Sequence, residues 1–309
     1  MKKKLLFAAV MSSLLCLSSC GQADVADDNE LHVTASFYPI YIIAENVIGN
    51  TEGIDLENMA QPQTGCLHDY QLSTGDMKKL ENTDLFIING GGMESFLDNA
   101  LDLFPDLAIV DTSKGVTSLE EDGHGHGETE GASEEGSEED DGHDHEENSH
   151  FWILPENAAI QAQNICEALS EACPDKAGEF EENTENFINS IKTIDTFDGN
   201  GTKVCIFNEA FAYLHLSYGF DVRLCVEMDE NQTPSARELA EIITTIKDEG
   251  ITLLIAADDA SKAIADTIAR ETDAKVIVLD PVLTGDFSPE SYVDALNENA
   301  RILKGSVDQ

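Results

Sequence analysis

Residues 203–226 read KVCIFNEAFAYLHLSYGFDVRLCV and contain the repeating unit of the fold. The apolar run Lys203–Phe207 predicts a short strand, and Ala210–Tyr218 has the apolar spacing of a helix. Val222–Val226 predicts a second strand. Short strands that alternate with helices indicate a parallel α/β sheet.

The same alternation continues on both sides of this stretch. In the second half we expect strands at Leu253–Ala256 and Lys275–Leu279 and helices at Ser235–Glu249, Ser261–Glu271 and Ser288–Leu303. In the first half we expect strands at His32–Ser36, Ile54–Met59, Leu85–Ile88 and Leu107–Val110 and helices at Phe37–Asn50, Ser73–Leu80 and Phe96–Leu103. Ser73 with Asp76 three residues later predicts a variant of the capping box.

Two such runs predict two α/β lobes with parallel sheets, joined by a long rigid helix. Between the runs lie an expected helix at Pro155–Leu169 and the mostly polar segment Asp175–Asp195, and a helix this polar often bridges domains. The expected boundaries are an N-terminal lobe at 31–172, interrupted by an insertion at about 119–148, a linking helix at 173–199 and a C-terminal lobe at 200–309.

The N-terminus predicts an exported lipoprotein. Three lysines precede the apolar run Leu5–Leu17, which is too short for a permanent membrane span and is typical of a signal peptide at 1–20. Leu17-Ser18-Ser19-Cys20 is similar to a lipobox, so we expect lipidation of Cys20, a flexible tether at 21–30 and an extracytoplasmic location on the cell membrane.

The composition excludes nucleic acid as a partner. The chain has 61 acidic and 17 basic residues and a net charge of −44, whereas phosphate binding needs a basic surface. An acidic surface attracts cations. The seven cysteines form neither a CxxC pair nor zinc-finger spacing, so they predict no particular disulfide.

A histidine-rich acidic tract, Glu120–Glu147, lies inside the insertion. It carries two His-x-His pairs, formed by His124 with His126 and by His143 with His145. Imidazole and carboxylate bind divalent transition metals, so the composition predicts auxiliary metal capture. A solvated spacer is the alternative. The tract leads directly into His150, in an apolar segment.

Four further segments carry residues suited to a binding site. They are Gly65–Tyr70 (GCLHDY), Ser149–Pro155 (SHFWILP), Phe207–Leu214 (FNEAFAYL) and Val278–Pro281 (VLDP). Each follows an expected strand or precedes an expected helix. Ligands of open α/β sheets bind beyond the carboxyl ends of the strands.

These segments, with SFYPIY at 36–41, resemble the cluster A-I metal-binding lipoproteins of zinc- and manganese-type ABC importers. The resemblance implies a metal site in the cleft between the lobes, with His68, His150 and Asp280 as ligands. It also implies a monomer that is not an enzyme and that delivers its metal to a membrane permease. A His-rich insertion is typical of the zinc-type members, so Zn²⁺ is the expected cargo, with Mn²⁺ or iron as alternatives.

The chain departs from the family pattern at Asn208, where zinc-type members have His and manganese-type members have Glu. An amide oxygen is a poorer zinc ligand than imidazole. Asn208 could bind the metal itself, Glu209 could replace it, or a histidine of the acidic tract could complete the site. Asn208 could also hydrogen-bond to a bound water or ligand instead.

Two other classes of function compete with transport. One is a metallohydrolase that uses an open position on the metal, although the chain has neither HExxH nor a nucleophile elbow. The other is a surface adhesin or a metal store.

Overall fold

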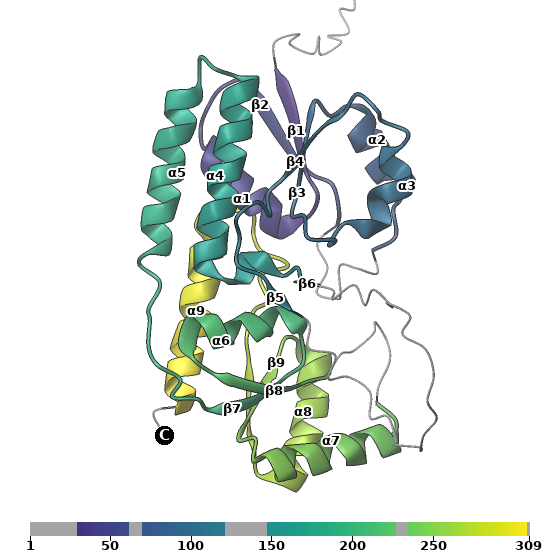
Figure 1. Ribbon diagram of the computed structural model, residues 1–309, viewed down its shortest axis with the longest axis vertical. Coiled ribbons are helices and arrows are strands. Elements are labelled where there is room, and N and C mark those ends of the chain that lie inside the picture. The colour runs from purple at the N-terminus through teal and green to yellow at the C-terminus, as the bar shows by residue number, and fades with distance from the viewer. Residues whose placement is uncertain (1–29, 62–69, 121–146, 227–233, 308–309) are drawn as a thin grey trace, which may run out of the picture. The chain divides into compact units, whose positions relative to one another are not determined.

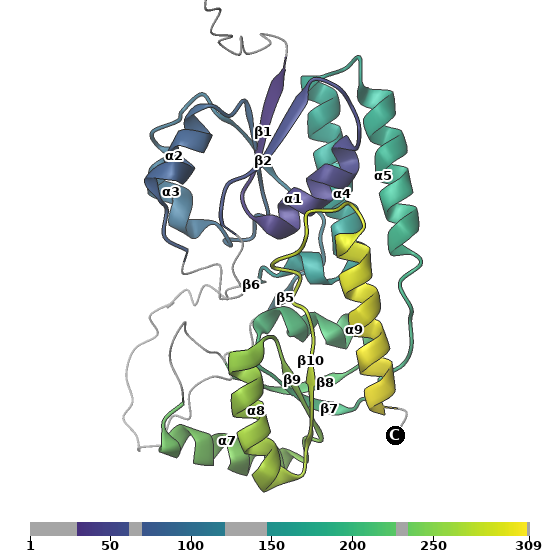
Figure 2. The same cartoon turned by 180° about the vertical axis from the view of Figure 1, so that it is seen from behind.

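The structure is a computed structural model that describes residues 30–61, 70–120, 147–226 and 234–307. It confirms two parallel α/β sheets, one in each lobe (Figures 1 and 2). The predicted signal peptide, Cys20 and nearly all of the tether lie outside the described residues, and so do His68, His124, His126, His143 and His145.

The N-terminal sheet has the strand order β2-β1-β3-β4, and all its pairs are parallel. Its strands are β1 (Leu31–Ala35), β2 (Ile54–Asn58), β3 (Leu85–Ile88) and β4 (Ala108–Asp111). On one face lie α2 (Thr74–Glu81), a 3₁₀ turn (Ser95–Leu97) and α3 (Asp98–Leu101), and on the other lie α1 (Tyr38–Ile48), α4 (Pro155–Ala172) and α5 (Ala177–Ile191) (Figure 1).

Alternation along β3 explains why both faces of this sheet are covered. Phe86 is buried in the cluster with Leu80 and Leu97, on the side of α2 and α3. Leu85 and Ile87 are buried in the larger cluster on the side of α1 and α4. Successive side chains of a strand point to opposite faces, so a strand buried on both faces is apolar throughout.

The C-terminal sheet has the order β10-β9-β7-β8, again parallel. Its strands are β7 (Lys203–Ile206), β8 (Asp221–Cys225), β9 (Leu253–Ala256) and β10 (Lys275–Val278). The helices α7 (Ala236–Glu249) and α8 (Asp259–Thr272) cover one face, while the 3₁₀ helix η4 (Glu209–Tyr213), α6 (Leu214–Tyr218) and α9 (Ser291–Val307) cover the other.

Two expected helices are shorter or less regular than the sequence predicts. The segment at Phe96–Leu103 forms a 3₁₀ turn followed by the single turn of α3. The helix expected at Ala210–Tyr218 begins as the 3₁₀ helix η4, with Asn208 as its N-cap residue. Apolar spacing alone does not separate 3₁₀ from α geometry over one or two turns.

The polar helix α5 lies in the segment expected to link the lobes. It packs along α4 and α1 and buries Phe180, Thr184, Phe187 and Ile191. Residues 192–202 then lead into β7. The helix α9 packs against α1. Its residue Tyr292 also lies against Phe187 of α5, with ring centroids 5.6 Å apart. Residues of both lobes therefore share one apolar cluster.

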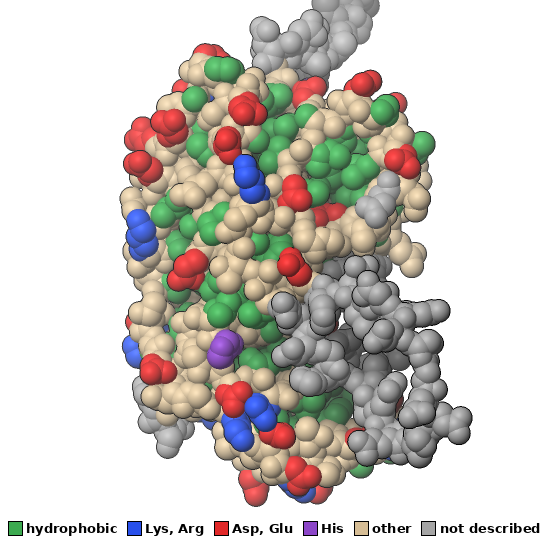
Figure 3. Space-filling model, in the orientation of Figure 1, with side chains coloured by type: hydrophobic (Ala, Val, Ile, Leu, Met, Phe, Trp, Pro, Cys, Tyr) green, Lys and Arg blue, Asp and Glu red, His purple; other side chains and the backbone are tan. Residues whose placement is uncertain are grey.

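A two-stranded antiparallel ribbon connects the insertion to the fold. It pairs β5 (Leu119–Glu120) with β6 (Glu147–Asn148), so Glu120 and Glu147 lie opposite each other at the two ends of the insertion. No helix in the described parts of the chain has the length and apolar character to span a membrane. Figure 3 shows acidic side chains spread over both lobes and fewer basic ones, as the composition implies.

Candidate metal centre

His150 lies two residues after the end of β6, as the N-cap residue of the 3₁₀ helix η3 (Phe151–Ile153) ahead of α4. The residue is buried, with 4% exposure. Its Nδ1 lies 3.0 Å from Oδ1 of Asn148, and its ring centroid lies 5.1 Å from that of Trp152. Nδ1 is therefore engaged by the protein.

Asn148 joins this segment to the Asn208 segment of the C-terminal lobe. Its Nδ2 donates to the carbonyl oxygen of Glu209 at 3.0 Å, and its own carbonyl oxygen accepts from the hydroxyl of Tyr213 at 2.6 Å. Burial raises the pKa of Tyr213, so this hydroxyl stays protonated and remains a donor. The residue just before the Ser149–Pro155 segment thus bonds to two residues of the Phe207–Leu214 segment.

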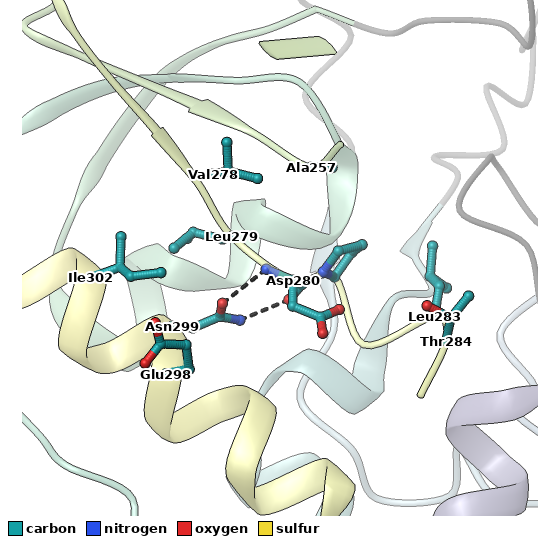
Figure 4. A pocket seen from close by; sticks show the side chains of 10 residues that line it. Ala257, Val278, Leu279, Asp280, Leu283, Thr284, Glu298, Asn299 and Ile302 are labelled. Atoms are coloured by element: carbon teal, nitrogen blue, oxygen red, sulfur yellow. Dashed lines mark hydrogen bonds between the residues drawn. The ribbon is translucent and has the colours of Figure 1, made fainter. Parts of the chain in front are cut away.

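Asp280 follows β10 and is held by Asn299 of α9. Its N–H donates to Oδ1 of Asn299 at 2.8 Å, and Nδ2 of Asn299 donates to its carbonyl oxygen at 2.7 Å. Figure 4 shows these two bonds and the carboxylate pointing away from Asn299. These bonds hold the backbone of Asp280 and do not involve its carboxylate.

The Asp280 carboxylate lines a pocket of about 340 Å³ beside Leu283 and Thr284 (Figure 4). Asp280 is exposed as a whole residue, yet its neighbours partly desolvate the carboxyl group, which raises its pKa. The N–H of Val282, 2.7 Å from Oδ1, opposes this shift. One oxygen thus accepts a backbone bond, while the other has no hydrogen bond from the described residues.

Trp152 ties the His150 and Asp280 segments together. Its indole N–H donates to the carbonyl oxygen of Pro281 at 3.0 Å, and its own carbonyl oxygen accepts from the hydroxyl of Tyr292 at 2.7 Å. Trp152 is fully buried. Its two hydrogen bonds therefore join the N-terminal lobe to two segments of the C-terminal lobe.

Asn208 is half-buried, and its side-chain oxygen accepts from the N–H of Ala210 at 2.9 Å. It thus caps η4, the usual role of asparagine at this position. Glu209 beside it is also half-buried. His215, further along, points Nδ1 at the carbonyl oxygen of Phe220, 2.9 Å away, which fits the packing role that its position suggests.

The predicted ligands are not assembled as one group by the described residues. His68 falls in the undescribed range 62–69, and no three His, Cys, Asp or Glu side chains among the described residues could share a metal ion. The ligand set of His68, His150, Asp280 and Asn208 therefore stays a prediction.

The sequence missed a buried polar network beneath His150. Oε1 of Glu94 accepts from the Ser36 hydroxyl and the Asn89 N–H, both at 2.7 Å, and Oε2 accepts from the Gly90 N–H at 3.1 Å. The side chain of Asn89 in turn donates to the carbonyl oxygen of Ser149 at 2.9 Å. Asn89 begins a glycine run, a pattern typical of a turn. The network joins residues far apart in the sequence, so no short motif predicts it.

Burial changes the acidity of Glu94. Desolvation raises its pKa to about 7, against the opposing effect of the Ser36 hydroxyl and the two backbone N–H groups. The adjacent Gly91 has φ +63°, and a Cβ there would lie 2.5 Å from the Phe151 ring. Glycine at position 91 is therefore required for the close approach of the His150 segment.

Comparison with known proteins adds the family. The model of "Zinc-uptake complex component A periplasmic" (ZnuA) matches residues 33–306. The zinc-binding lipoprotein AdcA of Streptococcus pneumoniae (strain ATCC BAA-255 / R6) is 29% identical over 327 residues, which cover 100% of this chain and 62% of AdcA. The high-affinity zinc uptake system protein ZnuA of Bacillus subtilis (strain 168) is 28% identical over 313 residues, covering 94% of this chain and 91% of that protein.

The fold has the same relatives. The crystal structure of Zn(II)-bound AdcA from Streptococcus pneumoniae has a TM-score of 0.69 at 24% identity, covering 91% of this chain and 58% of AdcA. This chain thus spans about 62% of the length of the first curated relatives. The resemblance expected from the motifs is confirmed, because the family model covers both lobes: the chain belongs to the family of the periplasmic zinc-uptake complex component A.

Proposed function

We propose that this protein is an extracytoplasmic substrate-binding lipoprotein that captures Zn²⁺ and delivers it to the membrane permease of an ABC importer. The observation that carries the proposal is the hydrogen bond from Trp152 to Pro281. It holds the His150 and Asp280 segments, one from each lobe, beside each other. The names of the relatives, a zinc-binding lipoprotein and a zinc uptake protein, support the choice of metal.

His68, His150 and Asp280 would bind the ion. Neutral imidazole and carboxylate are ordinary zinc ligands, and zinc sites have four positions. The capping bond of Asn208 favours a structural role for its side-chain oxygen, so Glu209 or a histidine of the acidic tract is the better candidate for the fourth position. No reaction would take place on the ion.

The acidic tract would collect ions and pass them inward through His124, His126, His143 and His145. Its attachment suits this role, because the β5–β6 ribbon places its C-terminal end three residues before His150. A lipid on Cys20 would keep the monomeric protein at the cell membrane.

Calorimetric titration with Zn²⁺ and with Mn²⁺ tests the proposal. We expect one tight zinc site per chain, which is lost in the His150→Ala and Asp280→Ala variants. The chain's single tryptophan, Trp152, lies against His150, so its fluorescence gives a second readout at the site. Tight Mn²⁺ binding with weak Zn²⁺ binding would instead assign the protein to manganese.

The same titration on a variant without residues 121–146 addresses the fourth ligand. A tight site that survives the deletion excludes a histidine of the tract as that ligand. Many equivalent ions per chain would favour metal storage, and hydrolytic turnover by the zinc-loaded protein would contradict the transport function.

A further inference from the structure

We propose that Asn148 is a positioning residue that keeps the imidazole proton of His150 on Nδ1, so that Nε2 presents its lone pair to the metal. The inference rests on the proposed function only for the metal that His150 would bind. The position of the proton on the His150 ring is a property of the metal-free protein and can be measured without any metal.

The contacts of Asn148 leave its side chain little freedom. Oδ1 lies 3.1 Å from the backbone N–H of His150 and 3.0 Å from Nδ1 of the same residue. Nδ2 lies 3.0 Å from the carbonyl oxygen of Glu209. The residue is 5% exposed, so water has little access to these groups.

Two of these contacts fix which end of the amide faces His150. A backbone N–H can only donate and a backbone carbonyl can only accept. If the amide were turned over, its NH₂ would face the N–H of His150, and its oxygen would face the carbonyl of Glu209. Both contacts would then be repulsive. The orientation with Oδ1 toward His150 therefore follows from groups whose polarity is fixed.

This orientation decides the tautomer of His150. An amide oxygen accepts but cannot donate, so Nδ1 must carry the proton to make the 3.0 Å contact. In a neutral imidazole the other nitrogen then has the free lone pair. Metal-binding histidines commonly donate their second ring N–H to an oxygen in this way, which fixes both tautomer and ring orientation.

The support for Asn148 comes from the C-terminal lobe. The Tyr213 hydroxyl donates to its carbonyl oxygen at 2.6 Å, and the Glu209 carbonyl holds its amide. Tyr213 and Glu209 both belong to η4, which Asn208 caps. The position where this chain departs from its family thus starts the element that orients the histidine from the other lobe.

Nitrogen-15 NMR of the metal-free protein, at a pH where His150 is neutral, tests the tautomer directly. We expect the proton on Nδ1 in the wild type. In Asn148→Leu, which has no acceptor, we expect a population with the proton on Nε2. The Asn148→Asp variant keeps an acceptor oxygen toward His150, so the proton should stay on Nδ1, although its second oxygen then faces the Glu209 carbonyl and should lower stability. Asn164→Leu is the matched control, because the side-chain bonds of Asn164 among the described residues go to the carbonyls of Thr112 and Lys114, away from His150.

Zinc titration of the same variants tests whether the position of this proton affects the affinity for Zn²⁺. We expect Asn148→Leu to lower the affinity for Zn²⁺ by about 10- to 100-fold, with partial recovery in Asn148→Asp and no change in Asn164→Leu. A proton on Nε2 in the wild type would overturn the inference even if Asn148→Leu failed to fold. Unchanged zinc affinity in a folded Asn148→Leu would also overturn it. A wild type with the Nδ1 proton but without zinc binding would contradict the proposed function and leave the tautomer assignment intact.

Discussion

Asn208 lies where the family resemblance predicts a histidine or glutamate ligand, and its side-chain oxygen already accepts a hydrogen bond. The amide oxygen caps η4 through Ala210. An imidazole at this position has a stronger zinc donor but a weaker capping group. Replacing Asn208 with histidine should therefore raise the affinity for Zn²⁺ and lower the stability of the fold.

For Asn208→His we expect tighter zinc binding, by about 10-fold or more, since one ligand adds at least about 1.4 kcal/mol. Loss of the cap should lower the free energy of unfolding by about 1 kcal/mol. Calorimetry and urea unfolding measure the two effects. The control is Asn208→Ala, which loses the cap alone and should keep the wild-type affinity. A loss of affinity in that control would show that Asn208 is itself a ligand.

Glu94 gives a prediction about pH. Burial raises its pKa from 4.5 to about 7, so between these values the folded protein holds a proton that the unfolded chain has released. Its contribution to stability is present at low pH and is lost as the pH rises toward 7. The loss amounts to about 3 kcal/mol at most.

Glu94→Gln cannot titrate, so we expect the free energy of unfolding to fall less steeply between about pH 5 and 7 than in the wild type. Urea unfolding of the metal-free protein across this range measures the slope. Other carboxyls contribute equally to both proteins, and the difference therefore isolates Glu94. Parallel pH profiles in the two proteins would contradict the assignment.

At the level of elements, helix starts were the best-specified local feature. The capping box predicted from Ser73 and Asp76 is confirmed. A second box joins Ser235 to Glu238 at the start of α7. A third joins Asp258 to Ser261 at the start of α8, where a serine replaces the usual Glu or Gln. These signals are local, since both partners lie within one turn.

The N-terminal cap of α7 is exposed, so a substitution there should remove the capping bond without disturbing the core. We expect Ser235→Ala to lower the free energy of unfolding by about 1 kcal/mol, because the N–H of Glu238 loses its acceptor. Thr244→Ala on the same helix removes a hydroxyl that donates to the Ala240 carbonyl within the helix, and should change stability by about 0.5 kcal/mol or less. Equal effects of the two substitutions would contradict a capping role.

For the whole molecule, the insertion should be dispensable to folding. Its ends, Glu120 and Glu147, are paired across the β5–β6 ribbon. A two-residue turn can join two antiparallel strands at such a position. Shortening a loop changes its closure entropy only slowly.

We therefore expect a protein with residues 121–146 replaced by Asn-Gly to fold with the stability of the wild type to within about 1–2 kcal/mol. Circular dichroism and urea unfolding check this. A control that replaces the same residues with a Gly/Ser linker of equal length separates loop length from composition. Loss of cooperative unfolding in both proteins would mean that the insertion is part of the folded core.

The sequence by itself determined most of the strands and helices, the two parallel sheets and the family. Strand and helix periodicity is a local property, and the motifs are short runs of adjacent residues. The tertiary structure alone decided how the site is supported. Trp152 meets the carbonyl of Pro281 129 positions away, Asn148 meets that of Glu209 61 positions away, and Ser36 meets the buried Glu94 58 positions away. No local pattern encodes such pairs, because each arises only when the strands have aligned and burial has removed the water that would otherwise satisfy these groups.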